Sequence, residues 1–218
     1  MLIILLFVPL VSGTWISSMN PITFANTTLI NLLNNGGYAI ISGDRNPALS
    51  IDEFHLSDGA IQERLGNLSN DLTNTFLYSS VLGVYDGASE NSFLVVLHNK
   101  SPEQERTIIC QLGEKYHQDS VIYVKQASPV IQQLIYTSGS LNGTYVEGEG
   151  YKILSSNVTD NYSSVRLCPN DMLTFTLNFD FEQMITRNNS RTKTREVIEH
   201  HARNRMFNQQ RKSAKIFN

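Results

Sequence analysis

Three polar clusters contain residue types that could bind a ligand or transfer protons, and each stands beside an expected strand. One follows the apolar run 38–42, a second precedes the run 92–97, and a third precedes 120–125. An arginine among them could hold a phosphate or carboxylate through two hydrogen bonds, and a carboxylate could serve as a base or a metal ligand. Ligands of α/β sheets commonly bind just beyond the strand ends. The predicted ligand-binding residues are Ser42, Arg45, Asn46, Glu90, Ser92, Gln118 and Asp119.

A structural interpretation of the same residues stays open. Groups that follow the first strand and groups that precede the later strands could lie at opposite ends of the sheet. They would then cap turns and helices, which Asp, Ser and Asn side chains commonly do. The sequence therefore allows either one shared pocket or separate caps.

Other catalytic motifs are missing from the sequence. It contains no Gly-x-x-x-x-Gly-Lys-Ser/Thr loop, no Gly-x-Ser-x-Gly turn and no His-Glu-x-x-His helix. Glu196 and His200 lie one helical turn apart with His201 beside them, but no ββ-metal scaffold accompanies them, so we predict no metal site and no cofactor. Three further histidines are scattered and are expected at the surface or half-buried: His55, His98 and His117.

The elements that must position the polar clusters alternate between apolar runs and helical patterns. Strands are expected at 38–42, 76–85, 92–97, 120–125, 131–137, 151–154 and 173–179. Ser50 and Glu53 form a capping box before one helix over about 51–72, and Ser101 with Pro102 begins a second helix. This alternation predicts an α/β or α+β fold, a mixed sheet with two main helices, a β-rich C-terminal extension and a basic, partly helical tail.

The chain of 218 residues is long enough for one domain with its own core, or for one domain with an appendage. The expected parts are an apolar leader at 1–18, an α/β domain at 19–137, a β-rich extension of that domain at 138–186, and a basic tail at 187–218.

The apolar leader resembles a signal peptide in length and in the small residues Val11-Ser-Gly13, although it has no basic first segment. It is too short to span a bilayer, and a buried strand or a start at Met19 are alternatives. Location is thus open between the secretory pathway and the cytoplasm. Export would permit a disulfide between Cys110 and Cys168, which in a cytoplasm would be inert core thiols. It would also permit glycans on the sequons at Asn26, Asn67, Asn142, Asn157, Asn161 and Asn188.

The charge is divided unevenly along the chain. Residues 1–186 hold eight basic and eighteen acidic side chains, whereas residues 187–218 hold nine basic and two acidic ones, so their net charges are −10 and +7. Ile198, Ala202 and Met206 add a narrow apolar stripe to this tail. The tail could be a helix that binds an acidic protein, an anionic membrane or nucleic acid, or a solvated terminus that docks on the acidic body. The candidate polyanion-binding residues are Arg191, Lys193, Arg195, Arg203, Arg205, Arg211, Lys212 and Lys215.

Four motifs resemble an uncharacterised small α/β domain family found in bacteria and tailed phages. They are Ile41-Ser-Gly-Asp-Arg-Asn-Pro47, Gly83-Val-Tyr85, Glu90-Asn-Ser-Phe-Leu-Val95 and Gly113-Glu-Lys-Tyr-His-Gln-Asp-Ser-Val121. The resemblance covers about residues 30–125, and its last motif is the most specific. It implies a fold and a viral or bacterial origin, and it implies no particular reaction.

Three functions are compatible with these patterns. The favoured one is a non-enzymatic viral or bacterial accessory protein that binds an unknown protein or polyanion through its electropositive tail. The second is a small enzyme or nucleotide-binding protein with a polar pocket around Arg45 and Glu90. The third is a secreted glycoprotein that recognises a host surface molecule.

Overall fold

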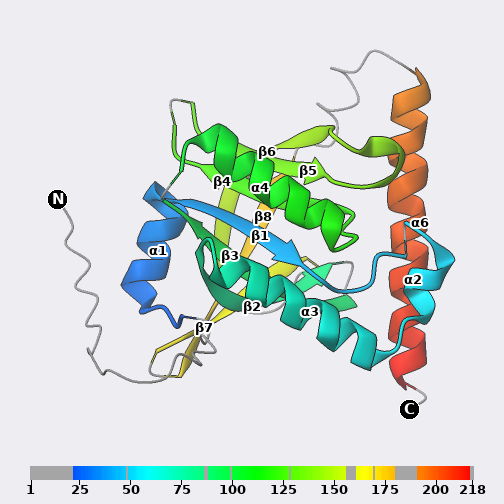
Figure 1. Ribbon diagram of the computed structural model, residues 1–218, viewed down its shortest axis with the longest axis horizontal. Coiled ribbons are helices and arrows are strands. Elements are labelled where there is room, and N and C mark those ends of the chain that lie inside the picture. The colour runs from blue at the N-terminus through cyan, green and yellow to red at the C-terminus, as the bar shows by residue number, and fades with distance from the viewer. Residues whose placement is uncertain are drawn as a thin grey trace.

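The computed structural model describes residues 22–47, 49–85, 88–98, 100–127, 129–155, 161–168, 170–179 and 191–216. Within them, antiparallel strands close into a barrel in the order β1-β3-β2-β7-β8-β6-β5-β4 (Figure 1). The strands are β1 (Gly37–Ser42), β2 (Leu77–Tyr85), β3 (Ala88–Leu97), β4 (Ser120–Lys125), β5 (Ile131–Tyr136), β6 (Tyr145–Leu154), β7 (Tyr162–Leu167) and β8 (Asp171–Phe179). The predicted α/β class, a mixed sheet with two main helices, was therefore wrong.

Helices cover the outside and the ends of this barrel. They are α1 (Asn26–Asn35), α2 (Ile51–His55), α3 (Asp58–Thr73), α4 (Pro102–Lys115) and α6 (Arg191–Ile216), with a short 3-10 turn η1 at Gly139–Leu141. The helices α3 and α4 connect strands, as the sequence pattern indicates, but all the strand pairs of the barrel are antiparallel. Apolar runs between helices look alike in a parallel sheet and in a helix-covered barrel, because both bury their strands on two faces.

Strand β1 shows how the two faces are filled. All six of its residues are buried, and successive side chains point to opposite faces. Ala39 and Ile41 pack outward on a cluster that includes Leu68 of α3. Tyr38 and Ile40 belong to a second cluster that fills the barrel interior. The barrel thus has an apolar interior and a cover of helices. The polar residue Ser42 lies at the end of β1, next to this apolar interior.

Helix α1 supplies Leu29 and Leu33 to the interior cluster, near the first residue of β1. Figure 1 shows α1 at one side of the barrel and α6 at the other. The interior cluster also contains Val165 and Phe175 from β7 and β8. The segment predicted to be a C-terminal extension therefore builds the barrel wall between β2 and β5.

The predicted helix starts are largely confirmed. Ser101 and Gln104 form a reciprocal capping box with proline in the first turn of α4, and the Ser50 side chain accepts a hydrogen bond from the Glu53 amide. The single helix expected over 51–72 was wrong, however. It divides into α2 and α3, because Ser57 caps a new helix by accepting from the amide of Ala60.

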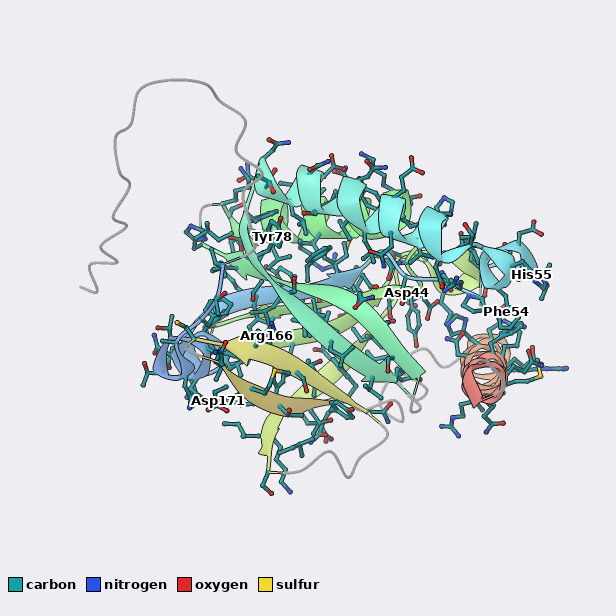
Figure 2. All side chains as sticks on the ribbon, turned by 90° about the horizontal axis from the view of Figure 1, so that it is seen from below. Asp44, Phe54, His55, Tyr78, Arg166 and Asp171 are labelled. Carbon is teal, nitrogen blue, oxygen red and sulfur yellow. The ribbon has the colours of Figure 1, made fainter. Side chains whose placement is uncertain are left out.

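The C-terminal segment forms one helix, α6, of 26 residues, and it lies beside α2. The rings of Phe54 and Phe207 are tilted toward each other with centroids 5.9 Å apart, and Figure 2 shows Phe54 next to α6 seen end-on. Among the described residues, no helix is both long and apolar enough to cross a membrane.

Candidate functional site

A cavity of about 290 Å³ opens at the end of the barrel away from α1. Its wall includes the last residues of β1 and β2, the first residues of β4, and one residue of α6. Apolar, aromatic and polar side chains share the lining. The residues that line the cavity include Ile40, Ser42, Gly83, Tyr85, Glu90, Ser92, Asp119, Ile122, Leu134, Tyr136, Tyr162, Phe179 and Asn204.

All seven residues predicted to bind a ligand line this one cavity: Ser42, Arg45, Asn46, Glu90, Ser92, Gln118 and Asp119. The antiparallel topology explains why they meet. Ser42 at the end of β1 pairs directly with Ser92 of β3, and β1 also pairs antiparallel with β4. In such a sheet the end of one strand lies beside the start of its neighbour. The alternative, polar groups at opposite sheet ends, does not apply here, while ligand binding itself stays a prediction.

Glu90 and Ser92 form one side of the cavity. Ser92 Oγ donates to Glu90 Oε1 at 3.1 Å, and both side chains lie beside Gly83, the strand partner of Glu90. A Cβ placed on Gly83 would come within 3.1 Å of Glu90 Cγ. The absence of a side chain at Gly83 therefore leaves the carboxylate its room at the cavity wall.

Ser42 and Gln118 both form hydrogen bonds with backbone groups beside the cavity. Ser42 Oγ donates to the carbonyl of Asn91 at 2.6 Å and accepts from the amide of Asp44 at 3.0 Å. Gln118 Nε2 donates to the carbonyls of Asp44 and Tyr116, each at 3.2 Å. Both side chains are buried, so they hold the β1 end and the start of β4 in register.

Arg45 uses its guanidinium to fasten the loop after β1. It donates to the Leu56 carbonyl from two nitrogens, at 3.0 and 2.6 Å, and to Asp58 Oδ1 at 2.7 Å. Asn46 similarly donates to the His117 carbonyl at 2.8 Å. These contacts give both residues a structural function in addition to their place in the lining.

A buried carboxylate, Glu53, stands behind this loop. It accepts two hydrogen bonds from Arg64 at 2.8 and 2.9 Å, one from the Asn46 amide at 3.2 Å, and lies 2.9 Å from His117 Nδ1. Burial by itself raises the pKa of Glu53, but the hydrogen bonds from Arg64, His117 and Asn46 and the charge of Arg64 outweigh it, so the pKa lies below its ordinary value. From the sequence, Glu53 was expected only to cap a helix.

Asp119 faces the cavity from the start of β4 and is held from α6. Its Oδ2 lies 2.8 Å from His200 Nε2 and accepts from Asn204 Nδ2 at 3.3 Å. Its Oδ1 is buried and has no hydrogen-bond partner among the described residues. Tyr136 packs its ring edge-on against His200 at 5.5 Å, and burial together with the nearby charges of Asp119 and Tyr85 raises the Tyr136 pKa. One carboxylate oxygen is thus fixed, and the other has no donor among the described residues.

His200 and Asn204 were not predicted to belong to the site. In the sequence, His200 stood out only for its spacing from Glu196, at which no metal site was predicted, whereas in the structure it pairs with Asp119. The four-residue spacing of His200 and Asn204 was a usable signal, because residues four apart share one face of a helix.

The remaining candidate residues lie elsewhere. The side chains of three predicted polyanion-binding residues are described, and all are exposed on α6: Arg195, Arg203 and Arg205. The other five side chains lie outside the described residues, namely Arg191, Lys193, Arg211, Lys212 and Lys215. Binding of a polyanion stays a prediction.

The structure holds both cysteines as free thiols, so the disulfide between them does not form in it. Cys110 is half-buried in α4, and Cys168 is exposed after β7. Among the sequons, four asparagines are exposed: Asn26, Asn67, Asn142 and Asn161. Asn157, Asn188 and the apolar leader at 1–18 lie outside the described residues.

Comparison with known families decides what kind of protein carries this cavity. Residues 48–166, more than half of the chain, match the family model described as the S-adenosylmethionine lyase family. The chain belongs to the S-adenosylmethionine lyase family. No curated protein matches the chain.

Membership in the S-adenosylmethionine lyase family bears on three expectations from the sequence. The favoured function, a non-enzymatic accessory protein, was wrong, because the family name denotes an enzyme and supports the alternative of a small enzyme with a polar pocket. The matched family is a phage-associated one, as the resemblance implied, whereas the four motifs that carried the resemblance remain untested. The family name also supplies a reaction, which the resemblance did not. Neither the barrel nor the family match supports a glycoprotein with a signal peptide and a basic tail.

The match to the S-adenosylmethionine lyase family covers only part of the cavity. Glu90, Ser92, Gln118 and Asp119 lie within the matched residues. Ser42, at the end of β1, precedes them, and all of α6 follows them. The lining therefore combines residues that the family model spans with residues that it does not.

Proposed function

We propose that the protein is an enzyme that binds S-adenosylmethionine in the barrel cavity and cleaves one of its carbon–sulfur bonds without water. The observation that carries this proposal is the placement of two carboxylates, Glu90 and Asp119, in one cavity and inside the matched residues. The substrate has a permanently charged sulfonium and an ammonium group, so an acidic lining suits it.

The size and walls of the cavity agree with part of a nucleoside-containing ligand. Its volume of about 290 Å³ lies at the lower end of the range for small-molecule sites, so we expect part of the ligand to remain outside. Tyr85, Tyr162 and Phe179 offer aromatic rings on which a purine could stack. Ser42 and Ser92 are direct strand partners that both line the cavity, and we assign their hydroxyls to contacts with the ribose.

A lyase needs a leaving group and an internal electron source, and S-adenosylmethionine contains both. The carboxylate of the substrate attacks the γ-carbon of its own side chain, so a carbon–oxygen bond forms as the carbon–sulfur bond breaks. The electron pair goes to sulfur, which leaves as the neutral thioether methylthioadenosine, and the other product is a five-membered lactone. No proton and no water molecule enter this step.

The protein's contribution to that step is position and polarity. Opposite charges cancel as the substrate carboxylate approaches the sulfonium, and the apolar side chains of Ile40, Ile122 and Leu134 favour such a loss of charge. The ammonium keeps its charge throughout, so a carboxylate that holds it contributes binding and orientation. We assign this part to Asp119, whose Oδ1 has no partner among the described residues.

The direct test is to incubate the purified protein with S-adenosylmethionine in water enriched in oxygen-18 and to analyse the products by mass spectrometry. We expect methylthioadenosine and an unlabelled lactone. Homoserine that carries the label at its side-chain hydroxyl in the earliest samples would show hydrolysis instead. Failure to form methylthioadenosine at all would refute the proposal.

Variants then connect the reaction with the cavity. Glu90→Gln and Asp119→Asn each remove a charge from the lining, and we expect kcat/KM to fall by about tenfold or more, the effect of losing a hydrogen bond to a charged group. Glu63→Gln, on the exposed face of α3, is the matched control and should change kcat/KM less than about twofold. Equal activity in all three variants would place the reaction outside this cavity.

A further inference from the structure

Helix α6 lies outside the matched family residues, yet it contributes one residue to the lining of the cavity. Asn204 is a lining residue, and His200 is buried with its ring between Tyr136 and Asp119. The two side chains lie one turn apart, so a single face of α6 reaches the barrel. The opposite side of the same helix exposes Ile198 and Met206.

Both hydrogen-bond donors from α6 converge on one atom. His200 Nε2 lies 2.8 Å and Asn204 Nδ2 lies 3.3 Å from Oδ2 of Asp119. A carboxylate fixed through one oxygen cannot turn without breaking these contacts. Asp119 lines the cavity, so its Oδ1 is held in one place at the cavity wall, where it is buried and has no partner among the described residues. A buried acceptor without a donor is costly, which indicates that a ligand donor belongs there.

We propose that His200 and Asn204 are positioning residues of the substrate site: they orient the Asp119 carboxylate so that Oδ1 receives the ammonium group of the substrate. This inference rests on the proposed function. It makes α6 part of the binding site for the amino-acid portion of the ligand. The adenosine portion is bound by other walls and should not depend on α6.

Two ligands allow the amino-acid portion and the adenosine portion of the binding site to be tested separately. S-Adenosylhomocysteine carries the ammonium group and a neutral sulfur, and methylthioadenosine carries the same nucleoside without the amino acid. Dissociation constants of both are measured by calorimetry for the full-length protein and its variants. His200→Leu removes the ring donor and keeps an apolar side chain against Tyr136, whereas His200→Gln keeps a donor near the position of Nε2.

For His200→Leu we expect the dissociation constant of S-adenosylhomocysteine to rise about tenfold, as for one lost hydrogen bond to a charge, with methylthioadenosine unchanged. His200→Gln should restore most of the affinity. In an Asp119→Asn background, His200→Leu should have little further effect, because both changes act on the same contact. Ile198→Ala, on the exposed face of α6, is the matched control and should bind both ligands like the wild type.

The results that would contradict this inference differ from the results that would contradict the proposed function. An equal loss of affinity for both ligands in His200→Leu would assign α6 a general structural function and overturn the inference. So would unchanged binding of S-adenosylhomocysteine, or full additivity with Asp119→Asn. If the wild-type protein binds neither ligand, the proposed function itself fails and the inference falls with it.

Discussion

Replacing Glu53 by glutamine should destabilise the protein strongly at neutral pH. The Glu53 side chain is 6% exposed, and it joins α2 to α3 through Arg64, to the turn before β4 through His117, and to the loop after β1 through the Asn46 amide. Glutamine keeps the shape and one acceptor oxygen but removes the charge. The guanidinium of Arg64, itself 16% exposed, then lies against a neutral amide.

The size of the expected loss in stability follows from the burial of the ion pair between Glu53 and Arg64. Removing one partner of a buried ion pair lowers the free energy of unfolding by about 3–5 kcal/mol, because an uncompensated charge stays inside. Arg64 retains some contact with solvent and His117 retains more, so we take the lower end, about 3 kcal/mol. That is a large share of the stability of an ordinary domain.

The loss should also depend on pH in a defined direction. Folding lowers the pKa of Glu53 below its ordinary value of 4.5. A carboxyl whose pKa is lowered by folding adds stability above its unfolded pKa, and that stability disappears as pH falls through the folded pKa. The difference between wild type and Glu53→Gln should therefore be full at neutral pH and shrink as the solution is acidified below 4.5.

Urea unfolding followed by circular dichroism measures this difference across the pH range. Glu63→Gln serves as the control, since this exposed carboxylate of α3 should change the free energy of unfolding by less than about 0.5 kcal/mol. A loss below about 1 kcal/mol for Glu53→Gln at neutral pH would refute the reasoning from burial. A difference that stays constant on acidification would refute the pKa argument.

Two further predictions concern packing and reactivity. A Cβ on Gly113 of α4 would lie 2.8 Å from Val121 Cγ1 and 2.9 Å from Thr137 Cγ2, so Gly113→Ala should lower the free energy of unfolding by about 1–3 kcal/mol despite the better helix propensity of alanine, and urea unfolding will measure it. A gain in stability would show that the neighbours move aside easily. Burial raises the pKa of the Cys110 thiol, whereas Cys168 is exposed, so iodoacetamide should modify Cys168 first in the native protein, as peptide mapping will show. Faster modification of Cys110 would contradict the packing of α4.

Local signals along the chain were strong enough to locate most elements. The apolar runs at β1, β3 and β4 and the capping box of α4 are present where the sequence predicts them. The arrangement of the strands could not be predicted from the same signals. Whether two strands run parallel or antiparallel depends on pairing between distant residues, and periodicity within one strand carries no information about its neighbour. The barrel closure between β1 and β4 is such a long-range feature.

The sequence left open whether the polar clusters share one cavity or lie apart as separate caps. The sequence analysis placed the polar clusters at strand ends of a mixed sheet, where they could have been far apart. In the antiparallel barrel, the end of β1 at Ser42, the start of β3 near Glu90 and the start of β4 near Asp119 reach the same opening. Residue type was thus informative about the site, and topology decided that the residues meet.

The C-terminal helix shows what a count of charges leaves undetermined. The net positive charge of the tail predicted that its arginines and lysines bind an acidic partner, and the acidic body of the same chain was one candidate for that partner. The hydrogen bonds that α6 makes to Asp119 instead come from His200 and Asn204, while Arg195 and Arg203 are exposed. The net charge of a whole segment describes a long-range attraction that salt screens. The place where a helix docks depends instead on the side chains of one face that form short hydrogen bonds. Helix α6 therefore contacts the site through His200 and Asn204, which the charge pattern of the tail did not single out.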